Sequence, residues 1–534
     1  MRIEPFLCAG TVGLVNGSLL IPRQTEASQF SWDQISESTE LRWEPCFVSY
    51  TCSRLIVPLD YTNSSAGNAT IAYIKQAAQR NSSSAEDILI NPGGPGESGV
   101  GAVLRLGPML AQLMPQYNIV GFDPRGVNNS GPALRCFGQD ERSRAREKEY
   151  STQFIRTVDG KSERSLRYQF EASTAFGKWC TKFNENTDAK YANTVAVAHD
   201  MAHYIEMVAK ASGKDPEEAK LNYYGVSYGT VLGTTFASLF PTRLGRFVLD
   251  GVVDAQDYYG GSFASNLRST DDVVNDFFRF CHAAGEIKCA IWDNSTEAIS
   301  KRTRNILESI RQFPIPVADS TVVEYPQVIR YEDISFIFMA TMYSPLSKWS
   351  VLSKMLSDIE RRDASSAAKF LSAVSPTVVG PTVMIGGIDA ARNNREKFNT
   401  YEKWTAYMAR LTKDSEWGAD AWATLGLAGK DLEIYPPVSQ QFNDTSFNVQ
   451  SNSPILFVSN THDPSTPLLG AQKMHSLFPG SGLLIQDAPG HVATLSAVSS
   501  CTLGHISHYF TSGQIPPPNT TCSVESVPFI SGGL

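Results

Sequence analysis

The sequence predicts an α/β fold, in which a mostly parallel, twisted β-sheet carries helices on both faces. Short apolar runs that end in glycine or aspartate recur along the chain. Helical patterns of apolar residues separate these runs, and strands that alternate with helices are typical of parallel sheets. At 534 residues, the chain is also long enough for a large core with an inserted second domain.

The first elements in order are an antiparallel pair of strands. These are the runs RLIVPLDY and ATIAYIKQAA, joined by the Asn/Ser/Gly-rich segment TNSSAGN. Further short apolar runs follow, namely DILINPGG, YNIVGFDPRG, LNYYGVS and RFVLDG. Helical patterns lie between them, most clearly in TVAVAHDMAHYIEMVAKAS and YGTVLGTTFASLF. This alternation predicts neighbouring parallel strands.

The pattern changes to mainly helical after residue 254. Helical runs include DDVVNDFFRFCHAAG, EAISKRTRNILESIRQF and VLSKMLSDIERRDASSAAKFLSAV. After a polar connector, strands return in PILFVSN and SGLLIQDAPGH. We therefore expect an N-terminal extension or atypical signal segment over 1–40, a core built from 41–254 and 451–534, and a helical cap inserted over 255–450.

Composition and charge exclude several functions. Hydrophobic residues make up 42% of the chain and charged residues 19%, which is ordinary for a globular protein. The net charge is −8 and no basic cluster stands out, so we expect no nucleic-acid partner. Beyond the N-terminus, no segment approaches the apolar run of 18 residues that a membrane span needs.

The nine cysteines and several glycosylation motifs indicate an oxidising compartment. No C-x-x-C is present, so a zinc ribbon or thioredoxin-like site has no support. The pairing that closes the shortest loops leaves Cys8 over, and the alternative is eight buried free thiols. The expected pairs are Cys46–Cys52, Cys136–Cys180, Cys281–Cys289 and Cys501–Cys522. N-x-[ST] motifs occur at Asn16, Asn63, Asn68, Asn81, Asn128, Asn294, Asn443 and Asn519.

The N-terminus resembles an export signal imperfectly. In MRIEPFLCAGTVGLVNGSLLIP, Arg2 precedes a mostly apolar run, but Glu4, Pro5 and Asn16 interrupt the pattern. We expect an atypical signal of a secreted glycoprotein, with a plain N-terminal extension as the alternative.

Ser227 is the candidate nucleophile. It lies in G-x-S-x-G between an apolar strand and a helical pattern, with Gly225 and Gly229 on either side. This strand–turn–helix context predicts a strained turn that exposes the serine hydroxyl at the carboxyl end of the sheet. A side chain at either glycine would collide with a neighbouring strand or helix.

A serine nucleophile needs a base and an acid that orients the base. His491 follows a late strand, and Asp463 lies 28 residues earlier after the preceding strand. In this architecture the acid precedes the histidine in the chain. We therefore expect Asp463 and His491 to complete a triad, with Asp250 and Asp487 as alternative acids. The side chain of His462 should point away from Asp463.

Acyl transfer also needs donors for the oxyanion. The glycine-rich run INPGGPGESG predicts donors at Gly93 or Gly94, together with the N–H of Tyr228, and a plain Gly-Pro turn is the alternative. The run HDMAH imitates a zinc motif through His199 and His203, but it carries aspartate rather than glutamate and lacks a third ligand. We expect no metal and no cofactor.

The motifs NPGGPGESG, GFDPRGVNNS, YYGVSYGT, HDPSTP and GHVATLSAVSSC together resemble the α/β-hydrolase peptidases related to tripeptidyl aminopeptidases and proline iminopeptidases. The resemblance is strongest to the tripeptidyl branch. It implies an α/β-hydrolase fold and a serine hydrolase that releases short N-terminal pieces from peptides, with Ser227, Asp463 and His491 as the triad. Asn91 replaces the histidine of proline iminopeptidases, and Val492 replaces a residue that is often small.

The resemblance leaves the substrate open, because one fold serves several hydrolytic activities. An esterase or a hydrolase of a small metabolite, a zinc peptidase and an inactive binding protein remain alternatives. For Asp123 and Arg125 we expect an Arg–carboxylate tie that pins the loop after a strand, with substrate contact as the alternative. An exopeptidase of this type should also hold the substrate's ammonium with carboxylates of the cap, where candidates include Glu286, Asp333 and Asp389.

Overall fold

A computed structural model describes residues 30–80, 84–154, 157–373, 379–390, 393, 396–442, 447 and 449–530. Residues 1–29 of the expected N-terminal segment, which include Cys8, and the motifs at Asn16, Asn81 and Asn443 lie outside these residues. The other five motif asparagines are described, and each of them is exposed.

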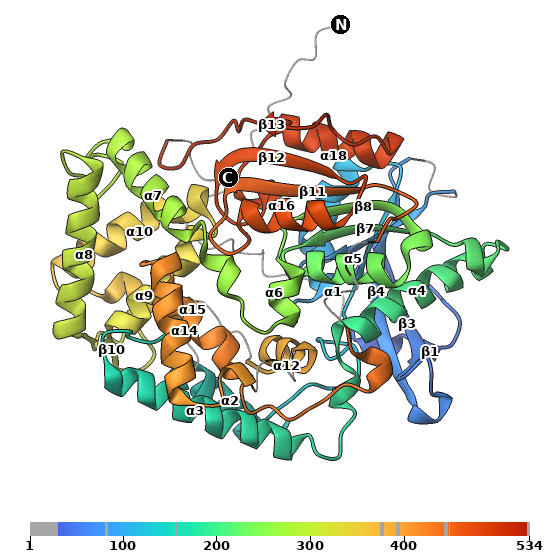
Figure 1. The fold of residues 1–534 in the computed structure, drawn as a ribbon, viewed down its shortest axis with the longest axis horizontal. Helices are drawn as coiled ribbons and strands as arrows, with labels where there is room; N and C mark the ends of the chain where they lie inside the picture. The colour runs from blue at the N-terminus through green and yellow to red at the C-terminus, as the bar shows by residue number, and fades with distance from the viewer. Residues whose placement is uncertain are drawn as a thin grey trace, which may run out of the picture.

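One large sheet organises the fold (Figure 1). Its strands are β1 (Glu37–Ser38), β2 (Glu44–Cys46), β3 (Tyr50–Pro58), β4 (Asn68–Gln76), β5 (Asp87–Asn91), β6 (Asn118–Phe122), β7 (Leu221–Val226), β8 (Leu244–Asp250), β11 (Ile455–His462), β12 (Gly482–Pro489) and β13 (Thr521–Cys522). Their order is β1-β3-β4-β6-β5-β7-β8-β11-β12-β13, and β2 pairs with β3.

The pairing confirms the expected strand directions. Strands β3 and β4 form an antiparallel pair, and β4 pairs antiparallel with β6. From β6 through β5, β7, β8 and β11 to β12, each pair of neighbours is parallel. The chain crosses from β8 to β11 only after some 200 residues, so the carboxyl ends of β7, β11 and β12 meet at one edge although they are far apart in sequence.

Helices cover both faces of the sheet, as expected for an α/β fold. On one face, α4 (Thr194–Ala211), α5 (Tyr228–Leu239) and α16 (Leu468–Leu477) share a core with Tyr223 of β7. On the other face, α1 (Gly99–Leu113) and α18 (Ser500–Ser512) share a second core with Tyr224. Alternate side chains of β7 therefore enter opposite cores, which is why this strand reads as continuously apolar. A short helix, α17 (Ala493–Ser496), follows β12.

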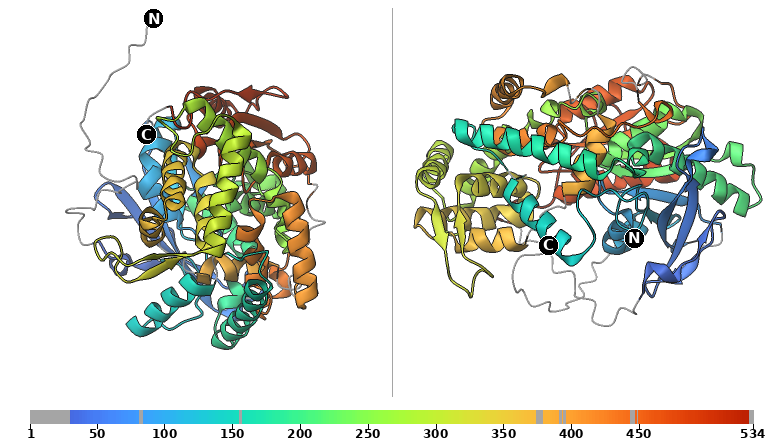
Figure 2. Two further views of the ribbon diagram at one scale, coloured as in Figure 1. Left: turned by 90° about the vertical axis from the view of Figure 1, so that its left-hand side faces the viewer. Right: turned by 90° about the horizontal axis from the view of Figure 1, so that it is seen from below.

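A mainly helical segment separates β8 from β11. Its helices are α6 (Ala255–Tyr259), α7 (Thr270–Ala284), α8 (Thr296–Gln312), α9 (Tyr331–Met342), α10 (Pro345–Glu360), α11 (Ser365–Ala373), α12 (Val379–Asp389), α14 (Tyr401–Asp414) and α15 (Ala419–Ala428). The strands β9 (Ile315–Val317) and β10 (Gln327–Ile329) form a small separate sheet. Helices α7 to α11 have a hydrophobic core of their own and lie to one side of the main sheet (Figures 1 and 2).

The long helical run 351–374 differs from a single helix. It is divided between α10 and α11, because Arg362 has a positive φ of 65° that an α-helix does not allow. The backbone N–H of Asp363 then returns to the carbonyl of Asp358, which closes the end of α10.

One helix from the first part of the chain, α3 (Glu163–Phe183), also contacts the inserted segment. Helix α2 (Glu141–Phe154) packs against α3. Lys430, just after α15, donates to the hydroxyl of Thr174 on α3 at 2.6 Å, and Phe170 packs in one cluster with Trp404 and Trp422. Helix α3 therefore lies alongside α14 and α15 (Figure 1).

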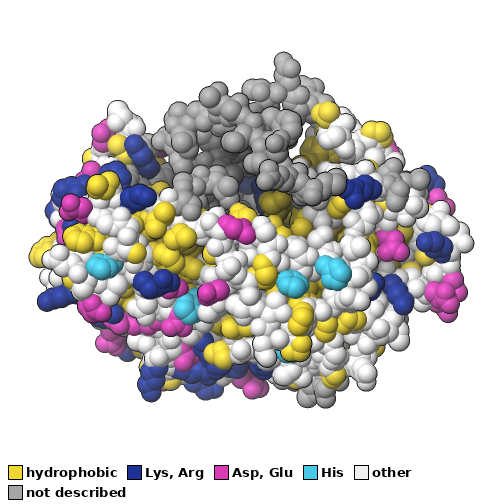
Figure 3. Space-filling model, turned by 90° about the horizontal axis from the view of Figure 1, so that it is seen from above, with side chains coloured by type: hydrophobic (Ala, Val, Ile, Leu, Met, Phe, Trp, Pro, Cys, Tyr) yellow, Lys and Arg dark blue, Asp and Glu magenta, His cyan; other side chains and the backbone are white. Residues whose placement is uncertain are grey.

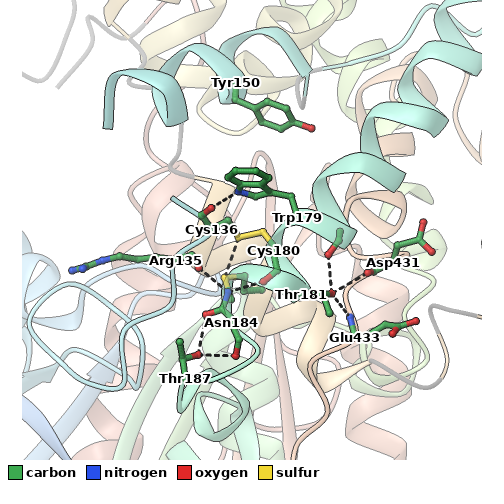
Figure 4. Close-up of a disulfide and its surroundings, with 12 residues drawn as sticks. Arg135, Cys136, Tyr150, Trp179, Cys180, Thr181, Asn184, Thr187, Asp431 and Glu433 are labelled. Atoms are coloured by element: carbon green, nitrogen blue, oxygen red, sulfur yellow. Dashed lines mark hydrogen bonds between the residues drawn. A yellow bond between two sulfur atoms is a disulfide. The ribbon is translucent and has the colours of Figure 1, made fainter. Parts of the chain in front are cut away.

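The four disulfides have the expected pairing. Cys136–Cys180 ties the segment after β6 to α3, and its surroundings are shown in Figure 4. The indole of Trp179 donates to the carbonyl of Cys136 at 2.5 Å, and the side chain of Asn184 donates to the carbonyl of Arg135 at 2.8 Å. The disulfide and these hydrogen bonds fix the end of α3 against the core.

The surface carries mixed charges. On the face shown in Figure 3, acidic and basic side chains alternate with polar ones, without a large area of one sign. In the described part of the chain, no helix combines the length and apolar character that crossing a membrane requires.

Candidate active site

Ser227 lies at the junction of β7 and α5 in a strained conformation. Its φ of 55° and ψ of −122° are rare for a residue with a side chain. The backbone N–H of Ser227 donates to the carbonyl of Asp250 at 3.0 Å, which anchors the turn on β8. The tight turn predicted from G-x-S-x-G is therefore confirmed.

The flanking glycines are required by close approach of the backbone. A Cβ at Gly225 would lie 2.4 Å from the carbonyl oxygen of Gly229, across the turn. A Cβ at Gly229 would lie 2.7 Å from the carbonyl oxygen of Asn91 at the end of β5. Both contacts are shorter than any real Cβ accepts, so the turn depends on both glycines.

His491 lies between Ser227 and Asp463. Its Nε2 is 3.0 Å from Oγ of Ser227, and its Nδ1 is 3.1 Å from each carboxylate oxygen of Asp463. The structure thus brings together the three residues that the sequence predicts, from the ends of β7, β11 and β12. A hydroxyl, an imidazole and a carboxylate in this order form a route for proton transfer from the serine.

Asp463 is fully buried yet favours its charged form. Burial alone would raise the pKa of Asp463, but the charge and hydrogen bond of His491 and the N–H groups of Ser465 and Val492 lower it below its usual value. The N–H and hydroxyl of Thr466 also donate to the carboxylate, at 2.8 and 2.7 Å. The carboxylate is therefore held in place and ready to stabilise a protonated imidazole.

Sequence reasoning missed the other contacts of the imidazole. The hydroxyls of Ser465 and Thr466 lie 3.0 and 3.1 Å from Nδ1 of His491. The run HDPSTP carried the signal, because two hydroxyl residues directly after an aspartate at a strand end commonly bond to that carboxylate. Tyr343, which follows α9, packs its ring against the imidazole with centroids 4.7 Å apart.

The alternative acids have other partners. Asp250 accepts hydrogen bonds from the N–H groups of Ala493 and Thr494, so it fixes the segment after His491 rather than its imidazole. Asp487 hydrogen-bonds the hydroxyl of Thr461. His462 points away from Asp463, as expected, and its Nδ1 lies 2.7 Å from the carboxylate of Asp276 on α7.

The glycine-rich loop after β5 approaches the nucleophile closely. Gly93 has a φ of 107°, and a Cβ there would lie 3.0 Å from Cβ of Ser227 and 3.2 Å from the backbone N of Tyr228. The N–H of Gly93 donates to the side chain of Asn91 at 3.0 Å. Of the two expected glycine donors, Gly94 is the one whose N–H has no such partner among the described residues. Tyr228 begins α5, so its N–H has no partner inside the helix.

The Arg–carboxylate tie exists, but the partner is not Asp123. Arg125 makes a two-pronged ion pair with Asp200 of α4, at 2.7 Å for each hydrogen bond, and both residues are buried. Asp123 instead accepts from the hydroxyl of Ser98 at 2.5 Å and from Asn129. Asp200 is the second residue of HDMAH, so that motif contributes a structural ion pair that holds the loop after β6.

A cavity of about 320 Å³ opens onto Ser227 and His491. Its walls are largely apolar and aromatic, with contributions from the core and from the inserted helices. They include Val253, Tyr258, Phe263, Tyr343, Val383, Trp422, Leu425 and Leu495. A concave, mostly apolar cavity with a few convergent polar groups is typical of a small-molecule or peptide site.

None of the three cap acids singled out from the sequence lines this cavity. Glu286 is exposed beyond the end of α7, and Asp333 accepts the N–H of Arg330 at the start of α9. Asp389 is partly buried and accepts from Tyr258 at 2.8 Å and from Thr194. The acid that does line the cavity is Glu97, which belongs to the glycine-rich loop rather than to the inserted segment.

Asp389 ends a hydrogen-bonded chain that reaches the active-site helix. The hydroxyls of Tyr228 and Thr194 are 2.5 Å apart, and Thr194 in turn donates to Asp389. Burial raises the pKa of Asp389 to about 6, although hydrogen bonds from Thr194 and Tyr258 oppose the shift.

Two family models match parts of this chain. A family model described as alpha/beta hydrolase fold matches residues 88–281, and one described as TAP-like protein matches residues 428–522. Ser227 lies in the first match, and Asp463 and His491 lie in the second. The two matches therefore cover the strands that carry the three residues.

Relatives match most of the chain. Serine protease Hip1 of Mycobacterium tuberculosis (strain H37Rv) is 26% identical over 90% of this chain and 91% of its own. Tripeptidyl aminopeptidase of Streptomyces lividans is 26% identical over 91% of this chain and 87% of its own. Carboxylesterase B of Mycobacterium tuberculosis (strain H37Rv) is 27% identical over 93% of this chain and 90% of its own. The chain therefore has the α/β-hydrolase fold and is a serine hydrolase that is similar over most of its length to proteins named as a serine protease, a tripeptidyl aminopeptidase and a carboxylesterase.

Proposed function

We propose that this protein is a secreted serine exopeptidase that removes short N-terminal pieces from peptides through an acyl-enzyme. The observation that carries the proposal is the continuous hydrogen-bonded chain Ser227–His491–Asp463 at the wall of a cavity. The relatives named as a serine protease and a tripeptidyl aminopeptidase support peptides as the substrate class.

Acylation begins at Ser227. His491 Nε2 takes the hydroxyl proton while Oγ forms a bond to the scissile carbonyl carbon, and Asp463 stabilises the resulting imidazolium. The N–H groups of Gly94 and Tyr228 donate to the oxyanion. His491 then gives its proton to the departing amine nitrogen, and the carbon–nitrogen bond breaks.

Deacylation repeats these steps with water. His491 takes a proton from a water molecule, whose oxygen attacks the ester carbonyl of the acylated Ser227. The carbon–Oγ bond breaks, the proton returns to Oγ, and the short peptide leaves as a carboxylic acid. No bound metal or redox group is required by this sequence of bonds.

The cavity favours a short apolar acyl portion. At about 320 Å³ it is at the small end of ligand sites, so it fits a few residues rather than a long chain. Aromatic walls at Tyr258, Phe263 and Trp422 would bury an apolar side chain next to the scissile carbonyl.

Secretion is supported by the cysteines and the glycosylation motifs. Four disulfides persist only in an oxidising compartment, and the five described motif asparagines are exposed as glycosylation requires.

An ester substrate is the second candidate. The relative named Carboxylesterase B is as similar as the peptidases, and the same triad cleaves esters. In an esterase, the substrate would carry no free ammonium group.

A substrate panel separates the two candidates. The quantity to compare is kcat/KM divided by the rate of uncatalysed hydrolysis of the same substrate. We expect this ratio to be higher for aminoacyl and tripeptidyl anilides with free N-termini than for simple p-nitrophenyl esters. Turnover confined to the esters would reject the peptidase proposal and retain the serine hydrolase.

A further inference from the structure

Glu97 is the one acidic side chain among the described residues that line the catalytic cavity. No lysine or arginine lines it, and the other ionisable lining residues are His491 and three tyrosines. Glu97 therefore lines the cavity without a lysine or arginine among the other lining residues.

The carboxylate of Glu97 is unpaired in the part of the chain that the structure describes. Its backbone N–H approaches the carbonyl of Gly93 at 3.4 Å, but its side chain forms no hydrogen bond or ion pair with a described residue. Asp463, Asp250 and Asp389, in contrast, each accept several hydrogen bonds. Glu97 thus retains its full capacity to accept hydrogen bonds from a ligand.

The environment of Glu97 favours a cationic partner. Burial raises the pKa of Glu97, and the charges of Arg105 and His491 compensate only in part. The Glu97 residue is nevertheless exposed in the free enzyme, so a cationic group of a ligand can reach its unpaired carboxylate and donate hydrogen bonds to it.

Glu97 is also held rigidly. The next residue, Ser98, begins α1 by accepting the N–H of Gly101 at 2.9 Å, and its hydroxyl donates to Asp123. On the preceding side, a Cβ at Gly96 would lie 2.9 Å from Pro381 of α12, so the loop fits closely against the inserted segment. The backbone that carries the Glu97 side chain is therefore held in place before substrate binds.

We propose that Glu97 binds the free α-ammonium group of the substrate and so makes the enzyme specific for N-termini. The proposal rests on the exopeptidase function above and assigns its specificity to the loop that also supplies the oxyanion donor. Sequence reasoning expected the ammonium subsite within the inserted helices. The proposal places it outside them, in the loop after β5.

The short connection between Gly94 and Glu97 limits the length of the released piece. Three residues of chain span at most about 10 Å. An extended substrate covers the same distance in about three residues. A cation at Glu97 and a carbonyl at Gly94 are therefore compatible with a scissile bond one to three residues from the N-terminus, and not with cleavage deep inside a chain.

Three matched substrates test the proposal on the full-length enzyme. They are trialanyl p-nitroanilide, its N-acetylated form, and p-nitrophenyl butyrate, which has no ammonium group. We expect Glu97→Gln to lower kcat/KM for the free tripeptide 10- to 100-fold and to lower it far less for the other two. The preference of the wild type for the free over the acetylated anilide should fall to near one.

Glu286→Gln is the matched control, because Glu286 is an exposed glutamate of the inserted segment that does not line the cavity. It should keep the wild-type preference. Reaction of each variant with a fluorophosphonate reports whether the site is intact.

Each remaining outcome contradicts the proposal in a distinct way. A Glu97→Gln enzyme that still prefers the free N-terminus rejects the role of Glu97 and leaves the exopeptidase function standing. An equal loss on all three substrates assigns Glu97 to the shape of the loop. A wild type that cleaves only the ester rejects the exopeptidase function itself, and this inference with it.

Discussion

The backbone N–H of His491 donates to the carbonyl of Tyr343 at 3.0 Å, and the Tyr343 ring packs edge-on against the His491 imidazole. Tyr343 follows α9, in the segment inserted between β8 and β11. The inserted helices therefore do more than cover the cavity, because one of them positions the proposed base.

Removing the Tyr343 ring should loosen the imidazole. We expect Tyr343→Ala to lower kcat by about tenfold, since misplacement of a catalytic group by a fraction of an ångström is costly. Tyr343→Phe keeps the ring and should retain most of the activity. Steady-state kinetics on one anilide substrate compare the two variants. Equal losses in both would mean that the hydroxyl, and not the ring, carries the effect.

Replacing Asp463 should cost nearly all turnover while leaving substrate binding. Asp463→Asn keeps the shape of the side chain but removes the negative charge that accepts the hydrogen bond from Nδ1 of His491. The amide also favours the wrong tautomer of the His491 imidazole. We expect kcat to fall on the order of 10⁴-fold with little change in KM, as for other triad acids. Asp250→Asn should instead lower stability, because Asp250 fixes the backbone of Ala493 and Thr494. A larger loss of kcat from Asp250→Asn would contradict the assignment of the acid.

Asp389 should make folding stability depend on pH. The pKa of Asp389 is about 6 in the folded chain against 3.8 as its ordinary value, so its ionisation opposes folding. This penalty is absent below pH 3.8, grows as pH rises, and is complete above pH 6, where it reaches up to about 3 kcal/mol. Asp389→Asn removes it.

Urea unfolding of both proteins between pH 4 and 7 measures this effect. The stability of Asp389→Asn relative to wild type should increase with pH across this range. A difference that stays constant with pH would show that Asp389 is already ionised without penalty.

His462 should strengthen the attachment of α7 at acidic pH. The hydrogen bond that His462 donates to the carboxylate of Asp276 raises the pKa of His462, although burial opposes the shift. Protonated His462 therefore stabilises the folded chain below pH 6.5, and this contribution is lost as pH rises through the raised pKa. Because the side chain of His462 is 37% exposed, the pair contributes at most about 1 kcal/mol.

His462→Gln measures this contribution against His508→Gln, a histidine that faces only Gln514. We expect a lower unfolding free energy for His462→Gln at pH 6 than at pH 8, relative to wild type. The same loss at both values would show that charge plays no part.

The fold was predictable because its signals are local. Tyr223 and Tyr224 enter opposite cores, so β7 appears as an uninterrupted apolar run, and Gly225 and Gly229 mark the only kind of turn that the backbone tolerates there. Ser227, Asp463 and His491 were also predictable, because strand order brings the ends of β7, β11 and β12 to one edge.

Contacts between segments could not be predicted in the same way. Arg125 pairs with Asp200 rather than with its neighbour Asp123, because α4 packs against the loop after β6. Glu97 belongs to a loop that packs against α12, and Tyr343 reaches the cavity from the position that follows α9. No periodicity or spacing encodes such packing, and none of the candidates Glu286, Asp333 and Asp389 lines the cavity.

The identity of the nucleophile is tested most directly by fluorophosphonate labelling followed by peptide mass spectrometry. We expect one labelled peptide, which contains Ser227, in the wild-type enzyme. Ser227→Ala should take up no label and lose at least about 10³-fold in kcat while its unfolding transition stays cooperative. Label on another serine, or turnover retained by the alanine variant, would contradict the assignment of Ser227 and the mechanism built on it.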